Sequence, residues 1–186
     1  GDVYKRQEGD PIKYAYANAS SMGSDILQNQ NQVPEFMVWA IRDLKRAPLD
    51  RVQIIKGWTE LSGKPHEKVY DVACSDGRKA NIKTGLCKDS RAKVNLSNCK
   101  ISKNFGADEL KVVWKDPDFN PNLKAFYYVR VLENPTCRWS TWDAIKSGEK
   151  PRGDLPSTIQ ERAWTSPIWY VPDNDGIEVR LSLIHI

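Results

Sequence analysis

The sequence predicts a mainly β protein, an immunoglobulin-like antiparallel β-sandwich with one or two short helices. Short runs rich in β-branched and aromatic residues recur along the chain. The 11 glycines and 11 prolines fall mostly between these runs, as turn residues do in an all-β chain. Seven tryptophans favour a core of large, flat side chains. No repeat of fixed period occurs, which argues against a propeller or a solenoid.

Six runs predict the strands. Residues 35–42 (EFMVWAIR) are apolar on both faces, which predicts a central strand. The sixth run, 162–170, contains Pro167, which cannot donate to a ladder and therefore predicts an edge strand or a bulge. The six predicted strands are 35–42, 51–58, 68–74, 109–115, 125–132 and 162–170.

Short helices are predicted near the end of the chain. Ser140 is the expected N-cap, Asp143 completes the spacing of a capping box, and Gly148 is the expected end. A second helical turn is expected to start at Ser157, with Gln160 three residues later.

The predicted organisation is one domain with flanking segments. Residues 1–7 and 181–186 resemble translated sequencing-adapter read-through, although the final residues alternate well enough to be a last strand. Residues 8–34 are polar and predict an extended lead-in from a missing catalytic domain. The β-sandwich is expected over residues 35–171 and a tail over 172–186.

Charge argues against a nucleic-acid partner. The chain has 28 basic and 24 acidic residues, a net charge of +4, with the two signs alternating along most of its length. This pattern is typical of a solvated surface. No apolar stretch approaches the roughly 20 residues of a membrane span.

Catalytic chemistry has few candidate residues. Apart from His185 in the suspect tail, the one histidine is His66, in a polar loop. A multinuclear metal site or a Ser-His-Asp triad needs more than this. Asp116 and Asp118 flank a proline and are weak candidates for binding a hard cation such as calcium. A turn in which an aspartate caps its own backbone explains the same spacing better.

The four cysteines are Cys74, Cys87, Cys99 and Cys137. Their even number and loop-rich setting favour disulfides, and hence an oxidising compartment, over four reduced thiols. Four cysteines allow three pairings, which the sequence cannot distinguish. Cys87–Cys99 is weakly favoured, as a local link within the polar insertion 78–104.

Two aromatic clusters are candidate binding surfaces. One lies around Trp139 and Trp142, and the other spans 164–170. Exposed, coplanar tryptophans would make a carbohydrate-binding platform. The favoured interpretation is that these tryptophans fill the core or an interface with a neighbouring domain, because bulky aromatic residues dominate such places.

Four blocks in order, 46–58, 69–78, 116–144 and 158–170, resemble the C-terminal part of a bacterial family, domain of unknown function 3604. Residues 16–25 (YANASSMGSD) resemble the segment that precedes it. The resemblance implies a parent similar to carbaryl-hydrolase-like, metal-dependent hydrolases of the PHP (polymerase and histidinol phosphatase) superfamily. It places the divalent metal ions in an N-terminal catalytic domain that opens with an Asp-Leu-His-x-His-type motif.

That motif is not found in this sequence, so no metal or catalytic residue carries over. What carries over is a non-catalytic accessory domain, periplasmic or extracellular like the family's exported members, whose partner is its own catalytic domain. The expected contact residues combine Trp with paired charges, which suits a part-polar interdomain interface. They are Arg138, Trp139, Trp142, Glu161, Arg162 and Trp164. The alternatives are a carbohydrate-binding or surface-ligand-binding module and a chain that is itself an enzyme.

Overall fold

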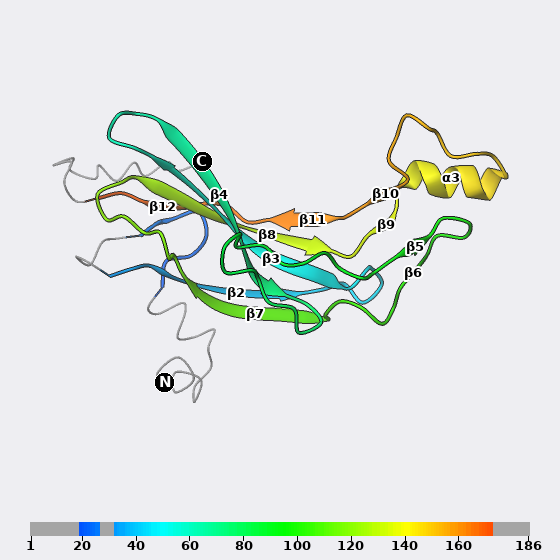
Figure 1. Ribbon diagram of the computed structural model, residues 1–186, viewed down its shortest axis with the longest axis horizontal. Coiled ribbons are helices and arrows are strands. Elements are labelled where there is room, and N and C mark those ends of the chain that lie inside the picture. The colour runs from blue at the N-terminus through cyan, green and yellow to red at the C-terminus, as the bar shows by residue number, and fades with distance from the viewer. Residues whose placement is uncertain (1–18, 27–31, 173–186) are drawn as a thin grey trace, which may run out of the picture.

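The computed structural model describes residues 19–26 and 32–172. One large sheet dominates it (Figure 1). Its pairings are antiparallel except for the parallel pairing of β1 with β12. The strand order is β1 (Asp25–Ile26), β12 (Ile168–Tyr170), β8 (Ala125–Glu133), β3 (Leu49–Thr59) and β4 (Pro65–Cys74), and β11 (Arg162–Trp164) also pairs with β8.

Three small antiparallel ladders and one helix complete the described chain, so the prediction of a mainly β fold is confirmed. The ladders are β2 (Glu35–Ile41) with β7 (Glu109–Lys115), β5 (Val94–Asn95) with β6 (Lys100–Ile101), and β9 (Thr136–Cys137) with β10 (Thr158–Ile159). In Figure 1 the β2–β7 ribbon runs alongside the large sheet, whereas α3 (Trp139–Ser147), β9, β10 and the β5–β6 hairpin lie at one end.

The central strand is β3, which is buried on both faces over most of its length. Its alternate residues point to opposite faces of the large sheet. On one face Ile54 and Tyr127 pack against Phe36 of the β2–β7 ribbon, and we call this the covered face. On the other face Gly57 lies opposite Phe126, and we call this the open face.

Strand β2 is not central. It pairs with β7 over its whole length, and no second partner strand occurs in the described chain. Phe36 is buried, but Met37, Trp39 and Ile41 point outward and are 54%, 42% and 67% exposed. The expectation of a central strand at 35–42 is therefore wrong, because an apolar run on both faces does not reveal whether both faces are covered.

The remaining predicted strands are confirmed, with one subdivision. Strands β3, β4, β7 and β8 occupy the predicted positions. The run 162–170 is divided into β11 and β12, which both pair with β8. Between them, the backbone N–H of Thr165 donates to the carbonyl oxygen of Val129. In return, Oγ1 of Thr165 accepts a hydrogen bond from the N–H of Val129. Pro167 falls in this interruption, outside either ladder.

The helix prediction needs two corrections. Helix α3 has Arg138 at its N-cap, with no side-chain cap, so Ser140 lies inside the first turn. Gly148 ends the helix in the left-handed conformation, as predicted, with a φ of 73°. Residues from Ser157 form no helical turn. Instead the carbonyl of Ser157 accepts bonds from the Arg138 N–H and the Thr141 hydroxyl, which leads the chain into β10.

Two further differences concern short features. Part of the predicted lead-in 8–34 forms β1, whose two residues are too few to show a period in the sequence.

All four cysteines form disulfides, as Cys74–Cys87 and Cys99–Cys137. The local pairing Cys87–Cys99 is therefore wrong. The termini 1–7 and 173–186 lie outside the described residues.

Candidate functional site

The expected contact residues form two groups rather than one patch. Trp139 and Trp142 lie on α3 and are 71% and 40% exposed. Arg162 and Trp164 lie on β11, where Trp164 is 57% exposed. Figure 1 shows β9 and β10 between α3 and β11. Arg138 is half-buried at the start of α3 and Glu161 is exposed just before β11.

The open face carries an additional set of aromatic residues. Trp169 lies opposite Phe126, and Trp164 lies opposite Arg130, so cross-strand pairing places all four side chains on this face. Alternation along β8 adds Tyr128 to it. We define the aromatic face as Phe126, Tyr128, Trp164 and Trp169.

These aromatic side chains form a partly exposed surface. The ring centroid of Phe126 lies 5.3 Å from that of Trp169 and 6.4 Å from that of Tyr128. Phe126 and Tyr128 are half-buried, whereas Trp169 is 47% exposed. The described residues therefore leave large aromatic area in contact with water on one face of the sheet, which is typical of a binding surface.

Gly57 explains how Phe126 lies so close to the sheet. A Cβ atom at residue 57 would come 2.3 Å from Cζ of Phe126. Glycine in the interior of the central strand therefore leaves room for the ring. Glycine within the predicted strand 51–58 is the sequence signal that could have indicated this close approach.

A hollow of about 610 Å³ opens beside the aromatic face. Phe126 and Trp169 line it on one side, and residues of the β3–β4 hairpin line it on the other. His66 belongs to this hairpin, where it stacks on Trp58 at 5.1 Å and its Nε2 lies 2.7 Å from Glu60 Oε1. Glu67 and Lys124 are the acidic and basic residues of the lining.

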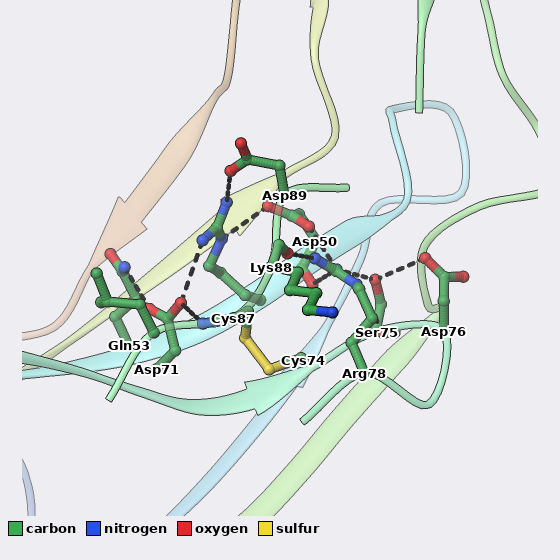
Figure 2. Close-up of a disulfide and its surroundings, with 12 residues drawn as sticks. Asp50, Gln53, Asp71, Cys74, Ser75, Asp76, Arg78, Cys87, Lys88 and Asp89 are labelled. Atoms are coloured by element: carbon green, nitrogen blue, oxygen red, sulfur yellow. Dashed lines mark hydrogen bonds and ion pairs between the residues drawn. A yellow bond between two sulfur atoms is a disulfide. The ribbon is translucent and has the colours of Figure 1, made fainter. Parts of the chain in front are cut away.

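A network of buried charged side chains lies at the end of the large sheet opposite the hollow (Figure 2). Asp71 accepts bonds from Gln53 Nε2 at 2.6 Å, from Arg51 Nη1 at 3.1 Å and from the Cys87 N–H at 2.6 Å. The Cys74–Cys87 disulfide keeps this N–H over Asp71. The carboxylate is therefore fully engaged within the protein.

A second carboxylate, Asp50, extends the same network. It is buried and lies 2.8 Å from Nε of Arg51 and 2.6 Å from Nη2 of Arg78. Arg130 links the network to the aromatic face, because its Nε donates to Gln53 at 2.7 Å while it lies opposite Trp164. These bonds fix the side chains that border the aromatic face.

The Asp116–Asp118 turn engages both of its carboxylates with protein groups. Asp116 Oδ1 accepts the N–H of Asp118 at 2.9 Å, so the predicted aspartate turn is present. Asp116 Oδ2 lies 2.5 Å from Nζ of the buried Lys56 and accepts the hydroxyl of Tyr127 at 2.8 Å. Asp118 Oδ2 accepts bonds from Lys68 and Tyr70.

These contacts shift the pKa values of Asp118 and Tyr70. Hydrogen bonds from Lys68 and Tyr70 lower the pKa of Asp118. Burial is the main cause that raises the pKa of Tyr70 well above its ordinary range, and its hydrogen bond to Asp118 adds to the effect.

Within residues 19–26 and 32–172, no group of three or more His, Cys, Asp or Glu side chains could hold a metal ion.

Comparison with known families identifies one match. The family model described as "Protein of unknown function (DUF3604)" matches residues 2–172. The chain belongs to this family. No curated protein and no solved structure matches the chain.

In this DUF3604 chain, the predicted contact residues Arg162 and Trp164 are both exposed on β11, and Trp164 belongs to the aromatic face. The predicted aromatic cluster 164–170 also includes Trp169. Sequence reasoning missed Phe126 and Tyr128, because alternation within AFYYVRVL does not say which face stays uncovered. Two disulfides are typical of an oxidising compartment. Among the described residues, no helix has the length and apolar composition needed to cross a membrane.

Proposed function

We propose that this chain is a non-catalytic accessory domain, an immunoglobulin-like β-sandwich at the C-terminal end of a larger PHP-like, metal-dependent hydrolase. It packs on the catalytic domain of that hydrolase through the aromatic face. The catalytic domain supplies the divalent metal ions, and the parent works in the periplasm or outside the cell. The resemblance of the four sequence blocks supports the parent's class, and the structure supports the choice of surface.

The observation that carries the proposal is the exposure of Trp164 and Trp169 on one sheet face, at 57% and 47%. Interfaces are enriched in Trp, Tyr and Arg, and residues of these kinds cluster near their centres. Arg130 and Arg162 stand among these aromatics, on β8 and β11. A part-polar aromatic surface of this kind is typical of the contact between two domains of one chain.

The buried charge pairs of the large sheet support a scaffolding role. Asp50 and Asp71 each engage an arginine in the interior, and Lys56 engages Asp116. Buried pairs of this kind hold side chains in one arrangement and leave the charges little freedom to act on a substrate. The domain therefore offers a rigid surface, from which it could also shape the entrance to a neighbouring active site.

The test uses the full-length parent protein. Replacing Trp164 and Trp169 together with serine is expected to lower the melting temperature of the catalytic domain and to change KM for an ester substrate. Trp39→Ser is the matched control, because Trp39 is 42% exposed but lies on the outer face of the β2–β7 ribbon. Unchanged melting and KM in the double variant would refute the proposed contact. Trp139→Ala tests whether the contact extends to α3, and Arg162→Ala tests whether it includes the charged residue beside Trp164.

A carbohydrate-binding module is the alternative, and one observation favours it. The hollow of about 610 Å³ places Trp169 and Phe126 beside Glu67 and Lys124, so apolar rings and charged groups line one cavity. Glycan-array binding by the chain, lost in Trp169→Ser and retained in Trp39→Ser, would support this function instead.

A further inference from the structure

The polar insertion 78–104 carries the excess positive charge of the chain. It holds eight basic residues and one acidic residue, a net charge of +7. The other 20 basic and 23 acidic residues give the remainder of the chain a net charge of −3, although the whole chain is at +4. A segment with charges of almost one sign is often a site of interaction with a partner of the opposite sign.

Seven of the basic side chains in the polar insertion are exposed, and none of them forms an ion pair with another described residue. They are Lys79, Lys83, Lys88, Arg91, Lys93, Lys100 and Lys103. The eighth, Arg78, is half-buried and pairs with Asp50. The acidic residue, Asp89, lies 3.9 Å from Arg51, which is outside the insertion. The exposed positive charges are therefore available to an anionic partner.

The β5–β6 hairpin places two of these lysines on one face. Val94 pairs with Ile101, and Lys93 bonds Ser102 through both its N–H and its carbonyl. Because side chains alternate along each strand, Lys93 and Lys100 share the face opposite Val94 and Ile101. Val94 and Ile101 are half-buried, so the hairpin turns its lysine face to solvent.

Two disulfides hold the polar insertion in place of a core. Between residues 78 and 104 the buried residues are Cys87 and Cys99. Cys87 is joined to Cys74 on β4, and Cys99 is joined to Cys137 on β9. Figure 1 shows the hairpin at the end of the molecule that also carries β9 and α3. The lysines are therefore presented from a segment that is covalently fixed to the large domain.

The composition of the insertion favours a lipid surface over a nucleic acid. Proteins bind nucleic acids through bidentate arginines or stacked aromatic rings. The insertion contains no aromatic residue, and six of its seven exposed basic residues are lysines. A lysine is a point charge without the planar fork of an arginine, which suits attraction to many anions rather than recognition of one.

Exposed aliphatic side chains lie among the lysines. Ile82, which is 102% exposed, precedes Lys83, and Leu96, which is 47% exposed, lies in the turn of the β5–β6 hairpin. Binding to an anionic bilayer combines contact of apolar side chains with the interface and attraction between basic residues and lipid headgroups. Both components are present in this one segment.

We propose that the polar insertion binds the surface of an anionic phospholipid bilayer. Lys93 and Lys100 contact headgroup phosphates, and Leu96 at the hairpin turn enters the headgroup layer. The other exposed basic side chains of the insertion add to the attraction. This contact uses none of the residues of the aromatic face and stands without the proposed accessory role.

The test measures binding of the 186-residue chain to lipid vesicles by co-sedimentation. The chain is expected to bind vesicles of phosphatidylglycerol and phosphatidylcholine in equal parts, and not vesicles of phosphatidylcholine alone, and added salt should weaken the binding. Lys93→Gln combined with Lys100→Gln should weaken binding by about tenfold. Lys64→Gln combined with Lys111→Gln is the matched control, because it removes the same charge outside the insertion, and it should bind almost as the unmodified chain does.

The contribution of the hairpin turn is tested separately. Leu96→Ser should weaken binding to the anionic vesicles several-fold. Leu61→Ser is its control, because Leu61 is 90% exposed but lies in the turn between β3 and β4, and it should leave binding unchanged. Urea unfolding verifies that each variant is folded.

Further measurements exclude other lipid contacts and other partners. Trp164→Ser combined with Trp169→Ser should retain binding to the anionic vesicles. Loss of binding in this tryptophan variant, equal binding to the neutral vesicles, or no binding to either would overturn the proposal. An equal effect of the two double lysine variants would also overturn it. So would tighter binding to a soluble acidic polysaccharide or to DNA than to the anionic vesicles, because the partner would then not be a lipid surface.

Discussion

The two faces of the large sheet differ in what lies over them, although the same strands build both. On the covered face Ile54, Tyr127 and Tyr170 pack with Phe36 into one core. On the open face the buried charges are satisfied around Asp71, but Trp164 and Trp169 remain exposed. The comparison shows that a sheet whose buried charges are paired can still leave aromatic side chains exposed on one face.

The largest expected effect comes from the charge network of the open face. Asp71→Ala removes the acceptor of three hydrogen bonds and leaves Arg51 with one fewer anion beside it. Breaking a buried pair in this way is expected to reduce the free energy of unfolding by about 3–5 kcal/mol. Urea unfolding monitored by fluorescence measures it. Asp154→Ala, which removes an exposed pair with Arg152, should leave the urea midpoint unchanged.

The Cys99–Cys137 disulfide is expected to matter next. It joins the β5–β6 hairpin to β9, 38 residues later in the chain. Replacing both cysteines with serine should cost about 2–4 kcal/mol, through loss of the constraint on the unfolded chain. Chemical denaturation with and without reductant checks this, since reductant should no longer affect this link in the variant. A double-serine variant as stable as the unmodified chain with its disulfides intact would contradict this expectation.

Gly57→Ala tests how the aromatic face rests on the sheet. The new Cβ would meet the Phe126 ring at 2.3 Å, so the ring must move away from β3. A cost of about 1–3 kcal/mol is expected from this overpacking, measured by thermal or urea unfolding. Adding Phe126→Leu should recover part of the loss. If both variants were equally destabilised, the close approach would not be the cause.

The smallest effect concerns acid stability at the Asp116–Asp118 turn. Because Lys68 and Tyr70 lower the pKa of Asp118 in the folded chain, its contribution is present above the unfolded pKa of about 3.9. That contribution is lost as pH falls through the lower folded pKa. Asp118→Asn should therefore be less stable at pH 7, by a small amount because the side chain is 50% exposed, and the difference should narrow in acid. Urea midpoints between pH 7 and pH 3 test this. A difference independent of pH would contradict it.

Much of the strand pattern could be predicted from the sequence, because β-branched and aromatic runs identify β3, β4, β7 and β8 directly. The position of β2 could not, since Met37, Trp39 and Ile41 are apolar yet point outward. The pairing of the four cysteines also could not be predicted from the sequence. Cys99 pairs with Cys137 from a hairpin beside β9, an arrangement that depends on tertiary structure.

The candidate site was predictable in part, for a related reason. Trp164 and Arg162 were recognisable as surface candidates because charges flank them in the sequence. Phe126 and Trp169 come together through cross-strand pairing of β8 with β12, which local periodicity cannot show. The fold class therefore depends on local patterns, whereas the surface depends on contacts between distant strands.

Hydroxyl-radical footprinting of Trp164 and Trp169 tests the central claim most directly. Both indoles are expected to be oxidised readily in this chain alone and to be protected several-fold in the full-length parent, where the catalytic domain covers them. Trp39, on the outer face of the β2–β7 ribbon, should be oxidised equally in both proteins. Equal oxidation of Trp164 and Trp169 in the two proteins would contradict the account, because the aromatic face would then contact no other part of the parent.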